Sequence, residues 1–202
     1  STLSDVPTTT AQISGEGSVK VTGGKGDGSV DLVFGQADSS YTGQTIVTGD
    51  AHLEAVNTNA LGNSSLVIGA EEGKGTVTIS AKNGNTRQLL HGLNVQKGSA
   101  LVLDSSDDKN VLVGVISEGD NRIDGALIAK NSNSTLAFGN LTALTISDQT
   151  DLSEFNGAFD LSYSDTASLN YEVQDGQTSL WNKSLKVNFG TNGGYLTKTG
   201  SG

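Results

Sequence analysis

Short apolar alternations, each bounded by turn residues, constrain the fold of this chain more than any other feature. Apolar residues recur at every second position, which places them on one face of a β-strand. The flanking Gly, Asn, Asp and Ser residues tolerate positive φ or begin turns. The alternating runs lie at 19–21, 30–34, 66–68, 77–79, 101–103, 111–115, 126–128, 136–138, 144–146, 159–161, 169–171 and 185–189. They predict an all-β body.

Two stretches carry helix-like spacing instead. Leu53, Val56 and Ala60 have this spacing within 51–61, and Leu152 and Phe155 have it within 148–155. Because neither stretch extends the pattern further, each is expected to be a short irregular excursion, with a turn of helix at most in 51–61.

Composition narrows the class of protein. The chain has 202 residues with 27 glycines and one proline, which suits many short strands in a single segment, 1–202. A net charge of −10 argues against nucleic acid as a partner. The longest charge-free stretch, 131–147, is too short and too polar to cross a bilayer, so this segment is not expected to be membrane-embedded. The chain begins without Met, and we interpret it as a fragment of a longer protein.

Whole phrases also repeat along the chain. Glycine or serine precedes an alternating strand in 13–21, in 93–103 and in 127–138, and the phrase at 41–47 is echoed at 155–161. Repetition of this kind favours a β-solenoid, in which each coil stacks on the next. An antiparallel β-sandwich stays open as the alternative, because several Asn-Gly and Asp-Gly pairs could form hairpin turns.

The phrase Tyr-Thr-Gly-Gln-Thr-Ile-Val at 41–47 is followed by a leucine strand and by Ala-Leu-Gly at 60–62, and the chain ends on Leu-Thr-Lys-Thr-Gly-Ser-Gly at 196–202. These residues resemble the passenger-associated repeats of bacterial type V autotransporters, both adhesin-like passengers and the stems of serine-protease autotransporters. The matching positions are Tyr41, Thr42, Gly43, Thr45, Val47, Leu53, Ala60, Leu61, Gly62, Leu66, Leu196, Lys198, Gly200 and Gly202. The chain departs from the repeat pattern at 22–38, where a glycine-rich segment and a further strand lengthen the gap.

The resemblance implies a right-handed parallel β-helix. It also implies a parent protein that reaches the bacterial cell surface or is secreted, through an outer-membrane β-barrel C-terminal to this fragment.

Candidate metal and histidine sites are few. The segment 23–28 is similar to a calcium-binding nonapeptide, but its aspartate, Asp27, falls one place early and the motif occurs once, so a turn is predicted. His52 and His91 are the only histidines, and neither lies near a serine nucleophile motif. Both are expected to be ordinary strand or loop residues.

Carboxylates and aromatic residues give the remaining candidates. Paired carboxylates of a glycoside hydrolase or lyase could come from Glu71 and Glu72, or from Asp104, Asp107 and Asp108. Adjacent carboxylates point to opposite faces of a strand, and 104–110 reads as a solvated loop. The aromatic residues Tyr163, Tyr171 and Trp181 could bind sugars or a partner, but core or edge packing is the preferred interpretation.

The sequence is compatible with three functions. The leading one is a non-enzymatic passenger segment with no catalytic, cofactor or metal site, acting as a stalk or adhesion surface in host adhesion, autoaggregation, biofilm growth or virulence. Its partners would be a host surface protein, a glycan or another copy of the passenger. The second function is the β-helical stem of a secreted serine protease, and the third is a polysaccharide-active β-helix.

Overall fold

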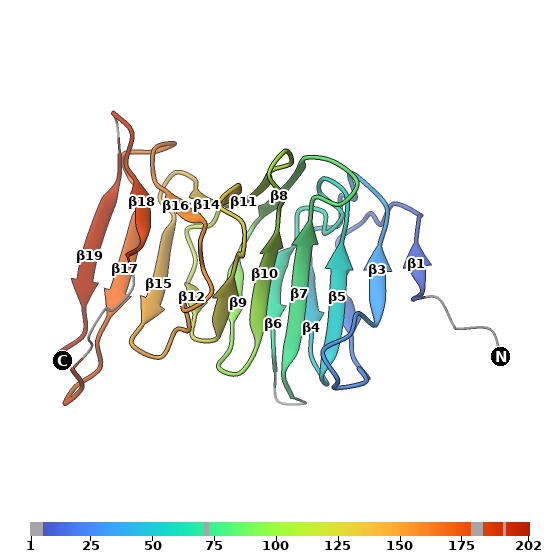
Figure 1. Ribbon diagram of the computed structural model, residues 1–202, viewed down its shortest axis with the longest axis horizontal. Coiled ribbons are helices and arrows are strands. Elements are labelled where there is room, and N and C mark those ends of the chain that lie inside the picture. The colour runs from blue at the N-terminus through green and yellow to red at the C-terminus, as the bar shows by residue number, and fades with distance from the viewer. Residues whose placement is uncertain (1–5, 71–72, 179–183, 192) are drawn as a thin grey trace.

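The structure, a computed structural model, describes residues 6–70, 73–178, 184–191 and 193–202. Its strands form three sheets (Figure 1). The six-stranded sheet contains β1 (Thr8–Thr9), β3 (Leu32–Phe34), β5 (Ala51–Ala55), β7 (Gly75–Ser80), β10 (Ala100–Asp104) and β13 (Ala126–Ile128). The five-stranded sheet contains β8 (Thr86–Leu90), β11 (Val111–Val115), β14 (Ser134–Phe138), β16 (Ala158–Asp160) and β18 (Lys186–Asn188). The eight-stranded sheet contains β2 (Val19–Val21), β4 (Gln44–Val47), β6 (Ser65–Ile68), β9 (Leu93–Val95), β12 (Asn121–Ile123), β15 (Ala143–Ser147), β17 (Ser168–Glu172) and β19 (Tyr195–Thr199).

The chain forms a right-handed parallel β-helix of about 7 coils. From β7 to β15 it visits the six-, five- and eight-stranded sheets in turn, whereas the strands before β7 alternate between the six- and eight-stranded sheets and those after β15 between the five- and eight-stranded sheets. The offset between paired positions is 21 residues from Thr45 to Leu66 and 28 residues from Val95 to Ile123. Figure 1 shows the strands side by side along the long axis, from β1 to β19. Every pairing between these strands is parallel, so the β-sandwich alternative is wrong.

Stacked apolar side chains fill the interior. In the eight-stranded sheet one ladder runs through Leu66 and Leu93, and continues on later coils through Leu144 and Leu169. All four side chains are almost fully buried. Because each coil covers the apolar residues of the previous one, a chain with few apolar residues still builds a continuous core.

Two polar residues occupy this ladder. Asn121 is 1% exposed, and its side-chain oxygen accepts from the Leu93 amide at 3.1 Å while its amide group donates to the carbonyls of Gly119 and Ala143, each at 3.1 Å. The other polar position is Thr45, which is also fully buried.

The hydroxyl of Thr45 belongs to a buried chain of hydrogen bonds. Since the chain ends on the Leu61 carbonyl, which only accepts, Tyr41 donates to Thr45, Thr45 donates to Ser64, and Ser64 donates to that carbonyl. Burial raises the pKa of the Tyr41 phenol. The hydrogen bonds satisfy the buried hydroxyl groups.

At the start of several strands a glycine lies directly against the backbone of the preceding coil, where a side chain would not fit. A Cβ at Gly43 would lie 2.3 Å from the Gly17 carbonyl oxygen, and one at Gly157 would lie 2.4 Å from that of Ser134. The same close approach occurs at Gly75, Gly125 and Gly194. These contacts explain Asp-Gly and Asn-Gly pairs that resemble hairpin turns: at Gly125 and Gly157 the glycine makes room between coils.

The segment 51–61 was expected to be a short irregular excursion with a turn of helix at most, and this is wrong for 51–55. Residues 51–55 form β5, where Ala51, Leu53 and Ala55 are buried, and the chain then passes through turns. Alternation therefore prevails over the helix-like spacing. The turn region covers the edge of β8, because the side-chain oxygen of Asn59 accepts from the Leu89 amide at 3.0 Å.

The segment 148–155 is irregular, as expected, and reaches the six-stranded sheet through isolated bridges at Asp151 and Phe155. The phrases at 41–47 and 155–161 share a buried aromatic residue and a crowded glycine. They lie on different sides of the coil, since one leads into β4 and the other into β16. Over the described residues, no helix has the length and hydropathy needed to cross a membrane.

Candidate functional site

The two histidines occupy separate places on the surface. The ring of His52, on β5, bridges neighbouring coils: Nδ1 donates to the Gly28 carbonyl at 3.0 Å, and Nε2 accepts from the Thr78 hydroxyl at 2.8 Å. This tautomer follows because a carbonyl only accepts. His91 is exposed just after β8. The described contacts give His52 a bridging position between coils.

The acidic candidates are held in local hydrogen bonds. Asp104 ends β10, and the loop that follows carries Asp107 and Asp108. Asp107 accepts from the Asn131 side chain at 2.9 Å, whereas Asp108 accepts from the Ser106 hydroxyl at 3.0 Å. The pair Glu71 and Glu72 lies outside the described residues.

The glycine-rich segment 23–28 is a surface turn attached to the next coil. The Gly24 amide donates to the Gly49 carbonyl at 2.9 Å. Asp27 accepts from the hydroxyl and the amide of Ser29, and these bonds hold the pKa of Asp27 below its ordinary value. Within the described ranges, no three His, Asp or Glu side chains lie close enough together to hold a metal ion.

A polar cluster lies on the eight-stranded sheet around Arg122 of β12. Its guanidinium group pairs with Asp124 at 2.9 Å and with Glu172 of β17 at 3.1 Å. The hydrogen bonds from Arg122 lower the pKa of Glu172, and those to the two carboxylates raise the pKa of Arg122. Gln96 and Gln149 help to line a cavity of about 380 Å³ beside the cluster. These contacts link separate coils through the guanidinium group.

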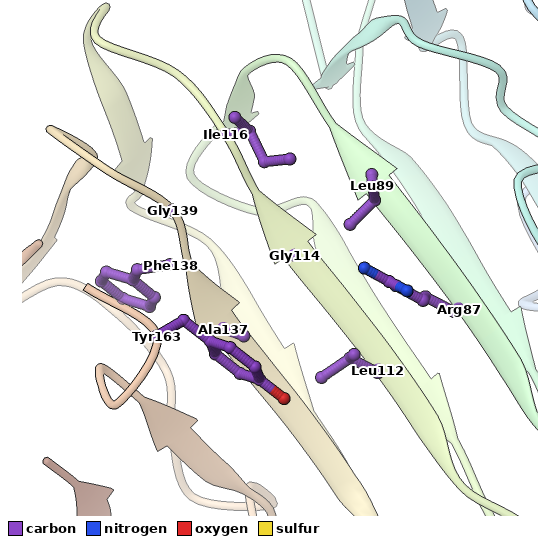
Figure 2. Close-up of a pocket in the computed structure, with 9 residues that line it drawn as sticks. All are labelled: Arg87, Leu89, Leu112, Gly114, Ile116, Ala137, Phe138, Gly139 and Tyr163. Carbon is purple, nitrogen blue, oxygen red and sulfur yellow. The ribbon is translucent and has the colours of Figure 1, made fainter. Parts of the chain in front are cut away.

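A hollow lined mainly by apolar residues lies on the outer face of the five-stranded sheet (Figure 2). It has a volume of about 280 Å³. Its lining residues come from β8, β11 and β14 and from the turns that follow the strands of this sheet: Arg87, Leu89, Leu112, Gly114, Ile116, Ala137, Phe138, Gly139 and Tyr163. We call this feature the apolar hollow.

Strand register produces the floor of the apolar hollow. Gly114 pairs with Leu89 on one side and with Ala137 on the other. Val113 and Val115 face the core, so alternation directs position 114 outward. Two small residues therefore lie side by side between larger neighbours, and a depression results.

The rim of the apolar hollow is exposed. Tyr163 is 65% exposed and Ile116 is 41% exposed. Figure 2 shows the Arg87 guanidinium group directed between Leu89 and Leu112 toward Gly114. Among the described residues that line the apolar hollow, Arg87 is the only charged one.

Among these residues only Tyr163 was a candidate from the sequence, and its exposure excludes the core packing that was one of the two preferred interpretations. Tyr171 is partly buried against the core, and Trp181 lies outside the described residues. A signal for the hollow was present in the run at 111–115, where Gly114 interrupts a valine-rich strand.

Comparison with protein-family models, with curated proteins and with solved structures finds no match for this chain.

Proposed function

We propose that this chain is a non-enzymatic β-helical segment of a bacterial surface or secreted autotransporter passenger, where it acts as a rigid stalk and presents an adhesion surface. The observation that carries the proposal is the parallel β-helix itself, with its continuous interior ladders. Every coil is hydrogen-bonded to its neighbours, which suits a part that must hold its length.

The residues that resemble passenger repeats have structural roles, which supports a scaffold. Tyr41 and Leu61 are buried, and Gly43 lies against the Gly17 carbonyl. Gly62 has a φ of +62°, a conformation that favours glycine. The motif thus specifies how coils stack and leaves the outer faces free to vary.

Adhesion would depend on those outer faces. With a net charge of −10, long-range steering favours basic partners or basic patches on a host surface protein, and like-charged copies repel one another at low salt. An acidic glycan or a second passenger would need short-range contacts strong enough to overcome this repulsion, whereas a neutral glycan would not be repelled.

Surface display tests the proposal. The chain would be fused to an outer-membrane anchor in a non-adherent bacterium, with the empty anchor as control, and host-cell attachment and settling of the culture would be measured. We expect attachment or settling to increase, and to depend on salt. Unchanged attachment and settling in displaying cells would contradict the adhesive role, and turnover of an acidic glycan by the purified chain would contradict the non-enzymatic one.

A further inference from the structure

Gly114 is a glycine that the fold itself does not require. Its backbone does not adopt a positive φ, and a Cβ there would meet only the end of the Leu89 side chain, at 2.9 Å. Gly125, by contrast, faces the Ser99 carbonyl oxygen at 2.3 Å. Glycine weakens a strand interior, and it often marks a place where a ligand comes close to the backbone.

Leu141 shows the opposite anomaly next to the same face. It lies two residues beyond Gly139 of the apolar hollow, its φ is +55°, and it is 55% exposed. This conformation favours glycine or asparagine over a residue such as leucine. Two neighbouring turns expose Ile116 and Tyr163. Leu141 thus adds an exposed apolar side chain close in sequence to the lining of the hollow, and clustered exposed apolar groups are typical of a surface that binds another macromolecule.

We propose that the apolar hollow binds a polypeptide segment that presents an aromatic side chain next to a carboxylate. The ring lies on the floor made by Gly114 and Ala137, between Leu89 and Tyr163. The carboxylate pairs with Arg87.

Size and charge select this ligand. A closed apolar cavity of about 150 Å³ accepts benzene, and the volume here is about 280 Å³, which leaves room for a ring and its flanking atoms. Arg87 has no ion pair among the described contacts, and the guanidinium geometry matches a carboxylate. The lining holds few hydrogen-bonding groups, which favours an apolar side chain over a sugar.

This proposal places the adhesion surface of the proposed function at the apolar hollow and names a class of ligand for it. It rests on the proposed function only in assuming that this face is accessible to a partner. Peptide binding is measured on the purified chain, and attachment is measured on displaying cells. A chain that binds peptide without causing attachment would refute the proposed function alone, whereas attachment without peptide binding would refute this inference alone.

The probe is the blocked peptide acetyl-Ser-Phe-Asp-Ser-amide, titrated into the ¹⁵N-labelled chain up to about 10 mM, since the expected Kd is of order 1 mM. We expect the shifts to concentrate at Gly114, Ala137 and Gly139. Replacing Asp by Asn in the peptide should weaken binding about tenfold, and replacing Phe by Ser should abolish it.

Substitutions in the chain test which of its residues contact the peptide. Arg87→Gln should weaken binding of the Asp peptide about tenfold and leave binding of the Asn peptide unchanged, with Lys130→Gln as the matched charge control. Gly114→Val should keep the chain folded and abolish binding, with Gly17→Ala as the glycine control, because a Cβ added at Gly17 would meet no atom within 4 Å.

The proposal is overturned if the shifts lie elsewhere, if the Asp and Asn peptides bind equally, or if an acidic oligosaccharide displaces the peptide with higher affinity. Concentration-dependent dimerisation through this face would overturn it too. If Gly114→Val fails to fold, the claim that the fold does not require this glycine is wrong. Tyr163→Ala then tests the binding site. Undiminished peptide binding by Tyr163→Ala would refute the proposal.

Discussion

Replacing Gly125 with alanine tests whether coil stacking depends on glycines beneath a carbonyl. Gly125 precedes β13, and an added Cβ would lie 2.3 Å from the Ser99 oxygen and 2.4 Å from the Gln96 oxygen. Two of the backbone hydrogen bonds that join the coils here start at or next to the crowded glycine: Gly125 donates to Val95 at 3.1 Å, and Ala126 donates to Ser99 at 2.8 Å. Alanine therefore forces the two coils apart at a point where they are hydrogen-bonded.

The cost follows from this geometry. Restoring ordinary contact near 3.4 Å requires a separation of about 1 Å, which takes both hydrogen bonds out of range. Each lost bond costs about 0.5–1.5 kcal/mol, and a buried group left without a partner costs more. The free energy of unfolding should fall by about 2–4 kcal/mol. With a urea dependence of about 2 kcal/mol/M, the unfolding midpoint falls by about 1–2 M.

Urea unfolding followed by circular dichroism measures this change. The matched control is Gly17→Ala, whose added Cβ would meet no atom within 4 Å, and its free energy of unfolding should stay within about 0.5 kcal/mol of wild type. A Gly125→Ala midpoint equal to that of the control would refute the reasoning that carbonyl crowding selects glycine at this position.

Three further predictions use the same measurement. Thr45→Val should lower the free energy of unfolding by about 2 kcal/mol and Tyr41→Phe by about 1 kcal/mol, because only the valine leaves a buried hydroxyl, that of Tyr41, without an acceptor. Equal losses would contradict the direction of the hydrogen bonds from Tyr41 through Thr45 to Ser64. The lowered pKa of Glu172 means that its ion pair with Arg122 stabilises the fold above about pH 4.5 and that this contribution is lost as the pH falls through the lowered pKa. The midpoint difference between wild type and Glu172→Gln should therefore shrink on acidification, and a constant difference would exclude the linkage. Leu144→Ala should cost about 3 kcal/mol through the cavity left in the interior ladder, and a loss below about 1 kcal/mol would show that neighbouring coils collapse to fill it.

Sequence patterns predicted the strands because burial in a β-helix is decided locally. Inward and outward positions alternate within each short strand, as Val111, Val113 and Val115 illustrate. Alternation also determines the structure of 51–55, which is a strand. The prediction there was wrong because Leu53 fits both the alternating pattern and the helix-like spacing.

The apolar hollow could not be predicted from the sequence. Leu89, Gly114 and Ala137 meet only because the coils between them have particular lengths, and coil length varies along the chain. The sequence shows a glycine in a strand without showing which neighbours stand beside it. The exposure of Tyr163 likewise depends on the turn between β16 and β17, whose shape no local pattern specifies.

The buried Asn121 has a consequence for how the coils find their partners. Leucine rungs such as Leu93 and Leu144 are chemically alike, so burial alone would accept β12 stacked one coil out of place. In such a misaligned stack the Asn121 side chain would keep the Gly119 carbonyl of its own coil but lose the Leu93 amide and the Ala143 carbonyl, at a cost of about 1–3 kcal/mol for each group left unsatisfied. Asn121 therefore helps to specify the register of the stacked coils, because it makes one alignment lower in free energy than the alignments shifted by a coil.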